Sequence, residues 1–243
     1  MAQTAARGII RNQLLSSLSV ADFDVLKPGL KTFDLELRKV LEEPNKPIQH
    51  VYFPQSGIIS VVAASPRQRQ IEVGIIGREG MTGINVVLGD TRSPHSTYVQ
   101  SAGQGLRIKA TDLRRAMQES TSMRDRLLHF VEAFMIQTAY TAFANGQATI
   151  SERLARWLLM AHDRLDGNEL PLTHEFLALM LCVRRTGVTG ALNVLESRGL
   201  VGAKRGIVIV LDRAGLKALA DGLYGIPEAE HRRLIGGRAK DQQ

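Results

Sequence analysis

The spacing of hydrophobic residues changes along this chain from a helical period to a β-type period and back. Near the start, residues 13–18 and 21–26 predict two short helices, and Ser19 and Asp22 are residue types that commonly cap helices. From residue 31 to residue 109, short β-type runs alternate with Pro, Gly and charged turns, which is typical of a compact antiparallel barrel or roll. The expected strands are residues 32–37, 50–53, 57–63, 70–76, 97–101 and 106–108.

A long apolar helix is predicted from residue 123 to residue 145. Hydrophobic residues stand on more than one of its faces, so we expect one face to pack on the roll and another on a second copy of the chain. These residues are Leu127, Leu128, Phe130, Val131, Phe134, Met135, Ala139 and Phe143.

The dipeptide Asn145-Gly146 interrupts this helical pattern, and we place a domain boundary there. The first domain is expected to span residues 1–145 and the second to span residues 146–243. The second domain opens with a predicted helix over residues 151–165, whose inward positions are Leu154, Trp157, Leu158 and Ala161.

Residues 170–211 read as two helices joined by a turn and followed by a β-hairpin. Thr173 suits the N-cap of the first helix and Glu175 its first turn, because a carboxylate is favourable at that end of the helix dipole. The turn is expected near residues 181–183, where Cys182 stands at a position that favours glycine. The apolar positions that should be buried are Phe176, Leu177 and Met180 in the first helix and Val188, Ala191, Leu192 and Leu195 in the second.

The opposite face of the second helix carries small and polar residues without Asp or Glu. Thr186, Gly190, Asn193 and Ser197 point outward, and Thr189 lies on the flank. A helix of this kind fits the major groove of B-DNA and reads base edges with its N-terminal residues. Such a helix-turn-helix is also a plain packing unit in other proteins, so its surroundings have to decide its role.

Basic residues concentrate around this second helix. Between residues 184 and 205 there are five basic residues and one acid, Glu196. Gly199 should end the helix, and residues 200–203 and 207–211 should pair as a wing around Lys204-Arg205-Gly206. An arginine can hold guanine with two hydrogen bonds, and asparagine can pair with adenine. The predicted DNA-binding residues are Arg184, Arg185, Thr186, Thr189, Asn193, Lys204 and Arg205.

Composition narrows the other possibilities. The formal net charge of +7 over 243 residues is compatible with a polyanionic partner. The stronger argument for DNA binding is the local excess of basic residues between residues 184 and 205. With Cys182 as its one cysteine, the chain has no intramolecular disulfide and no thiolate set for an iron–sulfur or zinc site, so a reducing cytoplasm is expected. The six histidines show no zinc spacing. We therefore expect no metal, no cofactor, no membrane association and no enzymatic activity, because phosphate loops and nucleophile–base–acid sets are also missing from the pattern.

The order of these elements resembles the Crp/Fnr superfamily of bacterial transcription regulators over nearly the whole chain. The segments that carry the resemblance are VYFPQSGIISVV (51–62), ISERLARWLL (150–159), LCVRRTGVTGALNVLESRGLV (181–201) and LDRAGL (211–216). The resemblance implies an α+β fold with an N-terminal antiparallel β-roll of the cyclic-nucleotide-binding type, a long dimerisation helix and a C-terminal winged helix-turn-helix domain. It also implies a homodimer that binds a near-palindromic double-stranded operator, with RNA polymerase as a partner if the protein activates.

The effector cassette departs from the pattern of the family members that bind a cyclic nucleotide. Those members have a Glu for the ribose and an Arg for the phosphate, whereas here Gly83 is followed by Ile84-Asn85, and His95-Ser96 stands where Arg-Ser is expected. Arg92 can take the place of the phosphate-binding Arg only if the loop shifts. An uncompensated phosphate is unfavourable in a partly desolvated pocket, so we expect no tight cyclic AMP binding. Candidate residues of a pocket for an unknown effector are Gly83, Ile84, Asn85, Arg92, His95 and Ser96.

Two alternatives stay open at this point. The first keeps DNA binding and makes the roll a sensor of haem, redox state or another small ligand, with Cys182 as a candidate redox-active residue. The second is an adaptor or an enzyme that uses the helix-turn-helix only as a scaffold.

Overall fold

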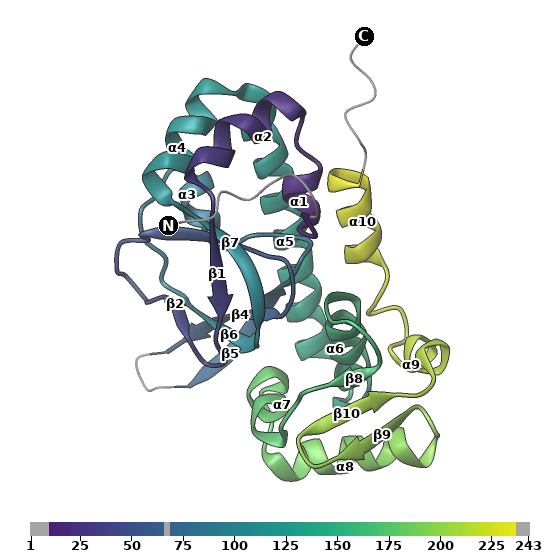
Figure 1. Cartoon of the computed structure of the whole chain (residues 1–243). Coiled ribbons are helices and arrows are strands. Elements are labelled where there is room, and N and C mark those ends of the chain that lie inside the picture. Colours follow the sequence, from purple (N-terminus) through teal and green to yellow (C-terminus); the bar gives the residue numbers. More distant parts are fainter. Residues whose placement is uncertain (1–9, 66–68, 237–243) are drawn as a thin grey trace. The chain divides into compact units, whose positions relative to one another are not determined.

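The structure is a computed structural model that describes residues 10–65 and 69–236 and falls into two compact units. The described part of the first unit comprises residues 10–61, 75–136 and 230–236, and the second comprises residues 62–65, 69–74 and 137–229. The helices (Figure 1) are α1 (Gln13–Ser16), α2 (Val20–Leu26), the 3-10 helix η2 (Lys27–Gly29), α3 (Ile84–Val87), α4 (Ala110–Glu119), α5 (Thr121–Gln147), α6 (Ile150–Arg164), α7 (His174–Leu181), α8 (Arg185–Ser197), α9 (Arg213–Leu219) and α10 (Ile226–Ile235). The strands are β1 (Lys31–Leu35), β2 (Val40–Glu42), β3 (His50–Pro54), β4 (Ile58–Ala64), β5 (Gln70–Ile76), β6 (Ser96–Ser101), β7 (Gly103–Lys109), β8 (Glu169–Leu170), β9 (Val201–Lys204) and β10 (Ile207–Val210).

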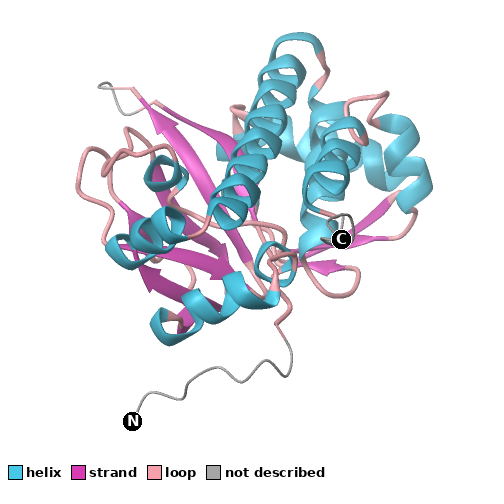
Figure 2. Ribbon diagram, turned by 90° about the horizontal axis from the view of Figure 1, so that it is seen from above, coloured by secondary structure: helices cyan, strands magenta, loops and turns pink. Residues whose placement is uncertain are grey.

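Strands β1 to β7 form the predicted β-roll, drawn in magenta in Figure 2. They make two sheets, with strand orders β1-β7-β3 and β2-β6-β4-β5. The registered pairs are antiparallel, as between Tyr52 and Arg107. Each predicted strand is present, although β1 stops at Leu35 instead of residue 37 and β7 begins three residues early at Gly103. Strand β2 was not predicted, because it has only three residues and a bulge in its pairing with β6.

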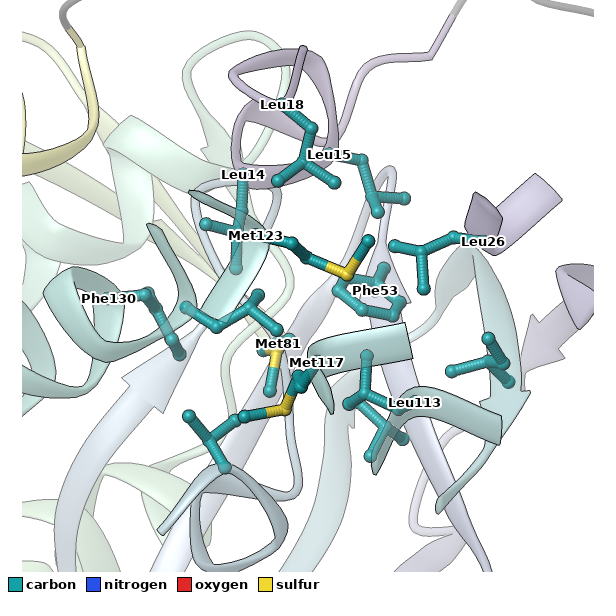
Figure 3. Close-up of a cluster of buried hydrophobic side chains, with 14 of the residues drawn as sticks. Leu14, Leu15, Leu18, Leu26, Phe53, Met81, Leu113, Met117, Met123 and Phe130 are labelled. Atoms are coloured by element: carbon teal, nitrogen blue, oxygen red, sulfur yellow. The ribbon is translucent and has the colours of Figure 1, made fainter. Parts of the chain in front are cut away.

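The core of the first unit lies between one sheet and the helices. Val51 and Phe53 of β3 join Leu106 and Ile108 of β7 in the same cluster. Tyr52, which points to the opposite face of the strand, is also buried, so β3 is covered on both faces. Figure 3 shows this cluster, in which the methionine side chains fill the space between leucines from α1 and α4. Labelled members are Leu14, Leu15, Leu18, Leu26, Phe53, Met81, Leu113, Met117, Met123 and Phe130.

Side-chain caps set where the first two helices begin. The Asn12 side chain accepts the Leu15 N–H and the Ser19 side chain accepts the Asp22 N–H, so the predicted role of Ser19 is confirmed. The amide of Asn12 also donates to the carbonyls of Pro54 (2.9 Å) and Gly80 (2.8 Å), which fixes α1 against the roll. Helix α1 ends at Ser16, two residues before the predicted end.

The second unit is built on α6. Thr149 and Glu152 form a capping box at its start, and Leu154, Trp157, Leu158 and Ala161 are buried as predicted. The indole N–H of Trp157 donates to Glu72 of β5 (2.7 Å), and residues 62–65 and 69–74 belong to this unit. Helix α5 continues through the Asn145-Gly146 dipeptide and one residue past it, to Gln147.

Helices α7 and α8 and the three-stranded sheet β8-β10-β9 complete the second unit as a winged helix-turn-helix. The α+β fold class with an N-terminal roll, a long helix and this C-terminal module is thereby confirmed. Within residues 10–65 and 69–236, none of the helices combines the length and the apolar character that crossing a membrane requires.

Candidate nucleic-acid interface

Helix α7 begins where its sequence pattern predicts. The Thr173 hydroxyl accepts the Phe176 N–H (3.3 Å), and Glu175 lies in the first turn. Leu177 and Met180 are buried, while Phe176 is half-buried. This face fixes α7 against the rest of the unit and leaves its N-terminal residues exposed.

The turn between α7 and α8 has a left-handed residue at its centre. Cys182 has φ 51° and ψ 47°, and its N–H donates to Leu179 O (3.2 Å) while the Val183 N–H donates to Ala178 O (3.0 Å). This pair of bonds is a Schellman motif, which usually has glycine at the position that Cys182 occupies. The expectation that Cys182 stands at a glycine-type position is therefore confirmed. Arg153 supports the turn by donating to the Leu181 carbonyl.

Helix α8 separates an apolar face from a polar face. Val188, Ala191, Leu192 and Leu195 are at most 4% exposed, as their spacing predicted. The residues expected on the outer side are all exposed. Arg184 is the N-cap and Arg185 the first helical residue, so both guanidinium groups stand at the end that enters a major groove in helix-turn-helix proteins. The exposed outer residues are Thr186, Thr189, Gly190, Asn193 and Ser197.

A second Schellman motif ends α8 and starts the wing. The Gly199 N–H donates to Glu196 O (2.9 Å) and the Leu200 N–H donates to Leu195 O (3.0 Å), with Gly199 at φ 69°. The Glu196 carboxylate accepts the Ala203 N–H (2.9 Å), which ties the wing to the helix. The one acid between residues 184 and 205 is thus engaged with backbone.

The wing differs from prediction in two details. Its tip is the two-residue turn Arg205-Gly206, because Lys204 pairs with Ile207 inside the ladder, whereas the sequence suggested a three-residue tip. A third strand, β8, pairs with β10 and was not predicted, since two residues carry too little periodicity to detect.

The predicted cations of the interface are exposed at the helix start and the wing tip. Arg185 forms an ion pair with Glu175 (3.3 Å), and Lys204 forms one with Glu169 (3.8 Å). All four side chains in these pairs are more than 60% exposed, so the pairs are weak and available for exchange with phosphate or base partners. Arg184 and Arg205 are likewise exposed.

In the β-roll, the predicted effector residues centre on Gly83, which begins the one-turn helix α3. Gly83 has φ 74°, and a Cβ there would lie 2.5 Å from Val51 Cγ2, so glycine is required. Ile84 and Asn85 follow in the helix and are half-buried. The Asn85 carbonyl accepts the Asp90 N–H (2.8 Å) and thereby closes the loop after α3.

Sequence reasoning missed the carboxylate that faces this helix start. Glu42 of β2 is 7% exposed, and its side chain accepts the Gly83 N–H (2.7 Å) and the Thr97 hydroxyl (3.0 Å). Burial raises the pKa of Glu42, and hydrogen bonds from Thr97, Gly83 and Thr82 oppose the rise. No sequence signal could identify Glu42, because it lies 41 residues from Gly83 in an unpredicted strand.

The remaining effector candidates lie in the loop before β6. Arg92 is exposed, and its backbone N–H donates to Asp90 Oδ1 (3.2 Å). His95 is half-buried, and its backbone N–H donates to Ser93 Oγ (3.1 Å). Ser96 begins β6. The side chain of Arg92 therefore lies at the protein surface, and it has to move to reach a ligand at Gly83. In the described part of the chain, no group of three or more His, Cys, Asp or Glu residues is arranged to hold a metal ion.

Two family models match the chain. A model of the cyclic nucleotide-binding domain matches residues 35–120, and a model of the Crp-like helix-turn-helix domain matches residues 152–219. No curated protein matches the chain in sequence.

Solved structures agree with both matches. A Crp/Fnr-family regulator from Eubacterium rectale is 19% identical with a TM-score of 0.67, over 85% of this chain and 97% of that one. FixK2 from Bradyrhizobium japonicum is 16% identical with a TM-score of 0.69, over 78% and 96% of the two chains. The c-di-GMP-responsive regulator CLP from Xanthomonas campestris is 16% identical with a TM-score of 0.63, over 79% and 99%. The chain therefore carries a region similar to cyclic nucleotide-binding domains and a region similar to Crp-like helix-turn-helix domains, and it shares the fold of these Crp/Fnr-family structures.

Proposed function

We propose that this protein is a transcription regulator of the Crp/Fnr type, a homodimer that binds a near-palindromic operator in double-stranded DNA through α8 and the wing. The observation that carries the proposal is the exposed, acid-free outer face of α8, with Arg184 and Arg185 at its N-terminal end. The carboxylate of Glu196 accepts a hydrogen bond from the wing backbone at Ala203, so it has a structural partner within the unit. Helix and wing together offer base contacts and phosphate contacts.

An exposed apolar stripe on α5 supports the homodimer. Met135 is 65% exposed, Phe143 55% and Leu128 37%. These residues and the exposed Ala139 and Ala142 recur at spacings that keep them on one side of a helix. Exposed apolar residues at this spacing are typical of a helix that packs on a partner. A second copy of α5 is the partner that gives a DNA-binding dimer with two-fold symmetry.

The contacts of Gly83 support a sensor unit that does not take cyclic AMP. The backbone N–H at the start of α3 is already bonded to the Glu42 carboxylate. A cyclic phosphate brought to the same place would meet a buried carboxylate, and like charges at short distance in a desolvated site repel strongly. We therefore propose that the unit binds an uncharged or cationic effector, or none.

Function divides at residue 145 in this proposal. Residues 1–145 carry the sensor and the dimer helix, and residues 146–243 carry the DNA-binding domain. The protein acts in the cytoplasm without catalysis, and it contacts RNA polymerase if it activates. A haem-sensing or redox-sensing roll is the alternative on the same scaffold, and a visible absorption spectrum of the freshly purified protein tests haem directly.

The salt dependence of binding to random duplex DNA tests the DNA-binding role. Each phosphate contact releases counterions, so log Kd should change linearly with log salt concentration, with a slope of about 0.9 per contact. We expect a slope of about four or more for the dimer, since each copy presents at least Arg205 and Lys204 at the wing. Binding that does not weaken with salt would favour the alternative in which the helix-turn-helix is only the scaffold of an adaptor or an enzyme.

A further inference from the structure

Four polar side chains form a hydrogen-bonded cluster at the base of the wing, within the second unit. His162 and Asp163 lie near the end of α6, Arg213 is the first residue of α9, and Tyr224 follows α9. These elements are labelled in Figure 1. All four side chains are half-buried, and none of them is among the proposed DNA contacts. We name these four residues the anchor cluster.

Arg213 is the centre of the anchor cluster. Its Nη2 donates to Asp163 Oδ1 (2.6 Å) and to the Tyr224 hydroxyl (2.7 Å), and its Nη1 donates to His162 Nδ1 (2.7 Å). The Tyr224 hydroxyl donates in turn to Asp163 Oδ2 (2.8 Å). Burial and the hydrogen bond to Asp163 raise the pKa of Tyr224, so its hydroxyl keeps the proton that it donates. The positive charge of Arg213 is thus compensated inside the cluster by the Asp163 carboxylate.

His162 connects the anchor cluster to the sheet that carries the wing. A guanidinium has donors only, so His162 Nδ1 is the acceptor and Nε2 carries the ring proton. Nε2 therefore donates to Asn168 Oδ1 (2.9 Å). The Asn168 carbonyl accepts the Val210 N–H (2.9 Å), and strand β8, which follows Asn168 directly, pairs with β10. Hydrogen bonds thus run without interruption from Arg213 to the last residue of β10.

The backbone holds Arg213 to the same end of the wing. The residues between β10 and Arg213 are Leu211 and Asp212, and their N–H groups donate to the Leu200 carbonyl (3.0 and 3.1 Å), one residue before β9. Both strands of the wing therefore meet at the anchor cluster, whereas Lys204 and Arg205 at the far end are exposed. A two-stranded hairpin has little stability of its own, so the direction of the wing depends on what holds its base.

We propose that Arg213, through the anchor cluster, is a positioning residue for DNA binding, which holds the wing in the orientation that brings Lys204 and Arg205 to phosphates beside the half-site. The inference rests on the proposed function and adds to it a residue that does not contact DNA itself. The Arg213 side chain is 40% exposed and is paired with Asp163, so a phosphate would have to break that pair to bind it. A wing that is ordered before binding pays a smaller entropic cost when it meets the phosphates.

The test uses the full chain and two variants that keep its net charge. Arg213→Lys keeps a cation but loses the planar fork that reaches three partners, and Tyr224→Phe removes only the hydroxyl. Lys217→Arg is the matched control, because Lys217 is an exposed cation on the same helix. Hydrogen exchange at the amides of residues 201–210 reports the order of the wing, and titrations on random duplex DNA at several salt concentrations report its phosphate contacts.

We expect both variants to show faster exchange in the wing, binding weakened by about threefold or more, and a salt slope reduced by about one or more. The ratio of operator affinity to random-duplex affinity should stay within about twofold, because the base contacts belong to α8. The sharpest comparison starts from a chain that already carries Lys204→Ala and Arg205→Ala. Adding Arg213→Lys there should change binding by less than about 1.5-fold, since no wing cation is left to position.

Three results would overturn the positioning role: an unchanged salt slope in both variants, a full further loss from Arg213→Lys in the chain without wing cations, or a lost preference for the operator. The second result would mean that Arg213 binds DNA directly or supports the whole unit. Failure of the proposed function is separate, because it is recognised when the unaltered chain and Lys217→Arg show no salt-dependent binding to duplex DNA. In that case the exchange measurement still decides whether the anchor cluster orders the wing.

Discussion

Arg185, the first residue of the recognition helix, is held by Glu175 of the preceding helix at 3.3 Å. Both side chains are about two-thirds exposed, so the pair contributes little to stability and a guanine or a phosphate can replace the carboxylate. The ion pair therefore orients Arg185, which we propose contacts a base, in an arrangement that is easily exchanged.

Loss of Arg184 or Arg185 should weaken specific binding more than loss of Lys204. If either arginine contacts a base, Arg184→Ala or Arg185→Ala lowers operator affinity by about 1–3 kcal/mol and relaxes the preference at one position. Lys204→Ala should weaken binding to all sequences alike and reduce the salt slope by about one. Titrations on operator and random duplexes at several salt concentrations measure this, with Glu175→Gln as the control that removes the ion pair alone. A changed base preference in Lys204→Ala would contradict the assignment.

Cyclic AMP and cyclic GMP should leave operator affinity unchanged. A ligand shifts a protein between two states only by its difference in affinity for them, and Glu42 occupies the N–H at Gly83 that a phosphate could use. Operator titrations with each nucleotide up to about millimolar concentration check this, and a tenfold gain, about 1.4 kcal/mol of coupling, would show that Arg92 or another cation has taken the phosphate.

Stability should respond to pH through Glu42. Its pKa is raised in the folded state by burial, so the folded protein binds this proton more tightly than the unfolded chain does. The contribution of Glu42 to stability is therefore complete below the unfolded-state pKa and is lost as pH rises through the raised folded-state pKa. Glu42→Gln keeps a hydrogen-bonding side chain and removes this loss. Denaturant unfolding at about pH 4 and pH 8 should show the variant gaining stability relative to the parent at the higher pH. An equal difference at both pH values would be inconsistent with a buried, titrating Glu42.

Met135→Asp should convert the dimer into monomers. A carboxylate at the centre of the α5 stripe would be buried without a partner in the dimer but exposed in the monomer, where Met135 is 65% exposed. Leu88→Asp is the control, since Leu88 is 59% exposed and lies outside α5. Sedimentation velocity measures both. A dimeric Met135→Asp variant would place the two-fold axis elsewhere.

Cys182→Gly should raise the free energy of unfolding by up to about 1 kcal/mol, because glycine adopts a positive φ without strain. The greater freedom of glycine in the unfolded chain offsets part of this gain. Cys182→Ala retains the φ strain and should show no comparable gain. Thermal or denaturant unfolding compares the three proteins. A Cys182→Gly variant less stable than Cys182→Ala would mean that the turn does not adopt the left-handed geometry in solution.

The helix-turn-helix was predictable because its signals are local. Thr173, Gly199 and the apolar spacing of α8 each act within a few residues, and the structure places them as expected. Glu42, the short strands and the anchor cluster were not predictable, since they depend on contacts between segments distant in sequence. The Arg213 contact with Asp163, for instance, joins residues 50 apart. Periodicity reveals which face of an element is buried but not which segment covers it.

Selection of bound duplexes from a random pool by the purified full-length protein tests the central claim most directly. The account predicts enrichment of a near-palindrome whose half-sites lie about 10–11 bp apart, centre to centre, because two copies of α8 related by a two-fold axis enter successive major grooves on one face of the DNA. No enrichment, or an enriched site without dyad symmetry, would contradict the proposal that this chain reads an operator as a homodimer.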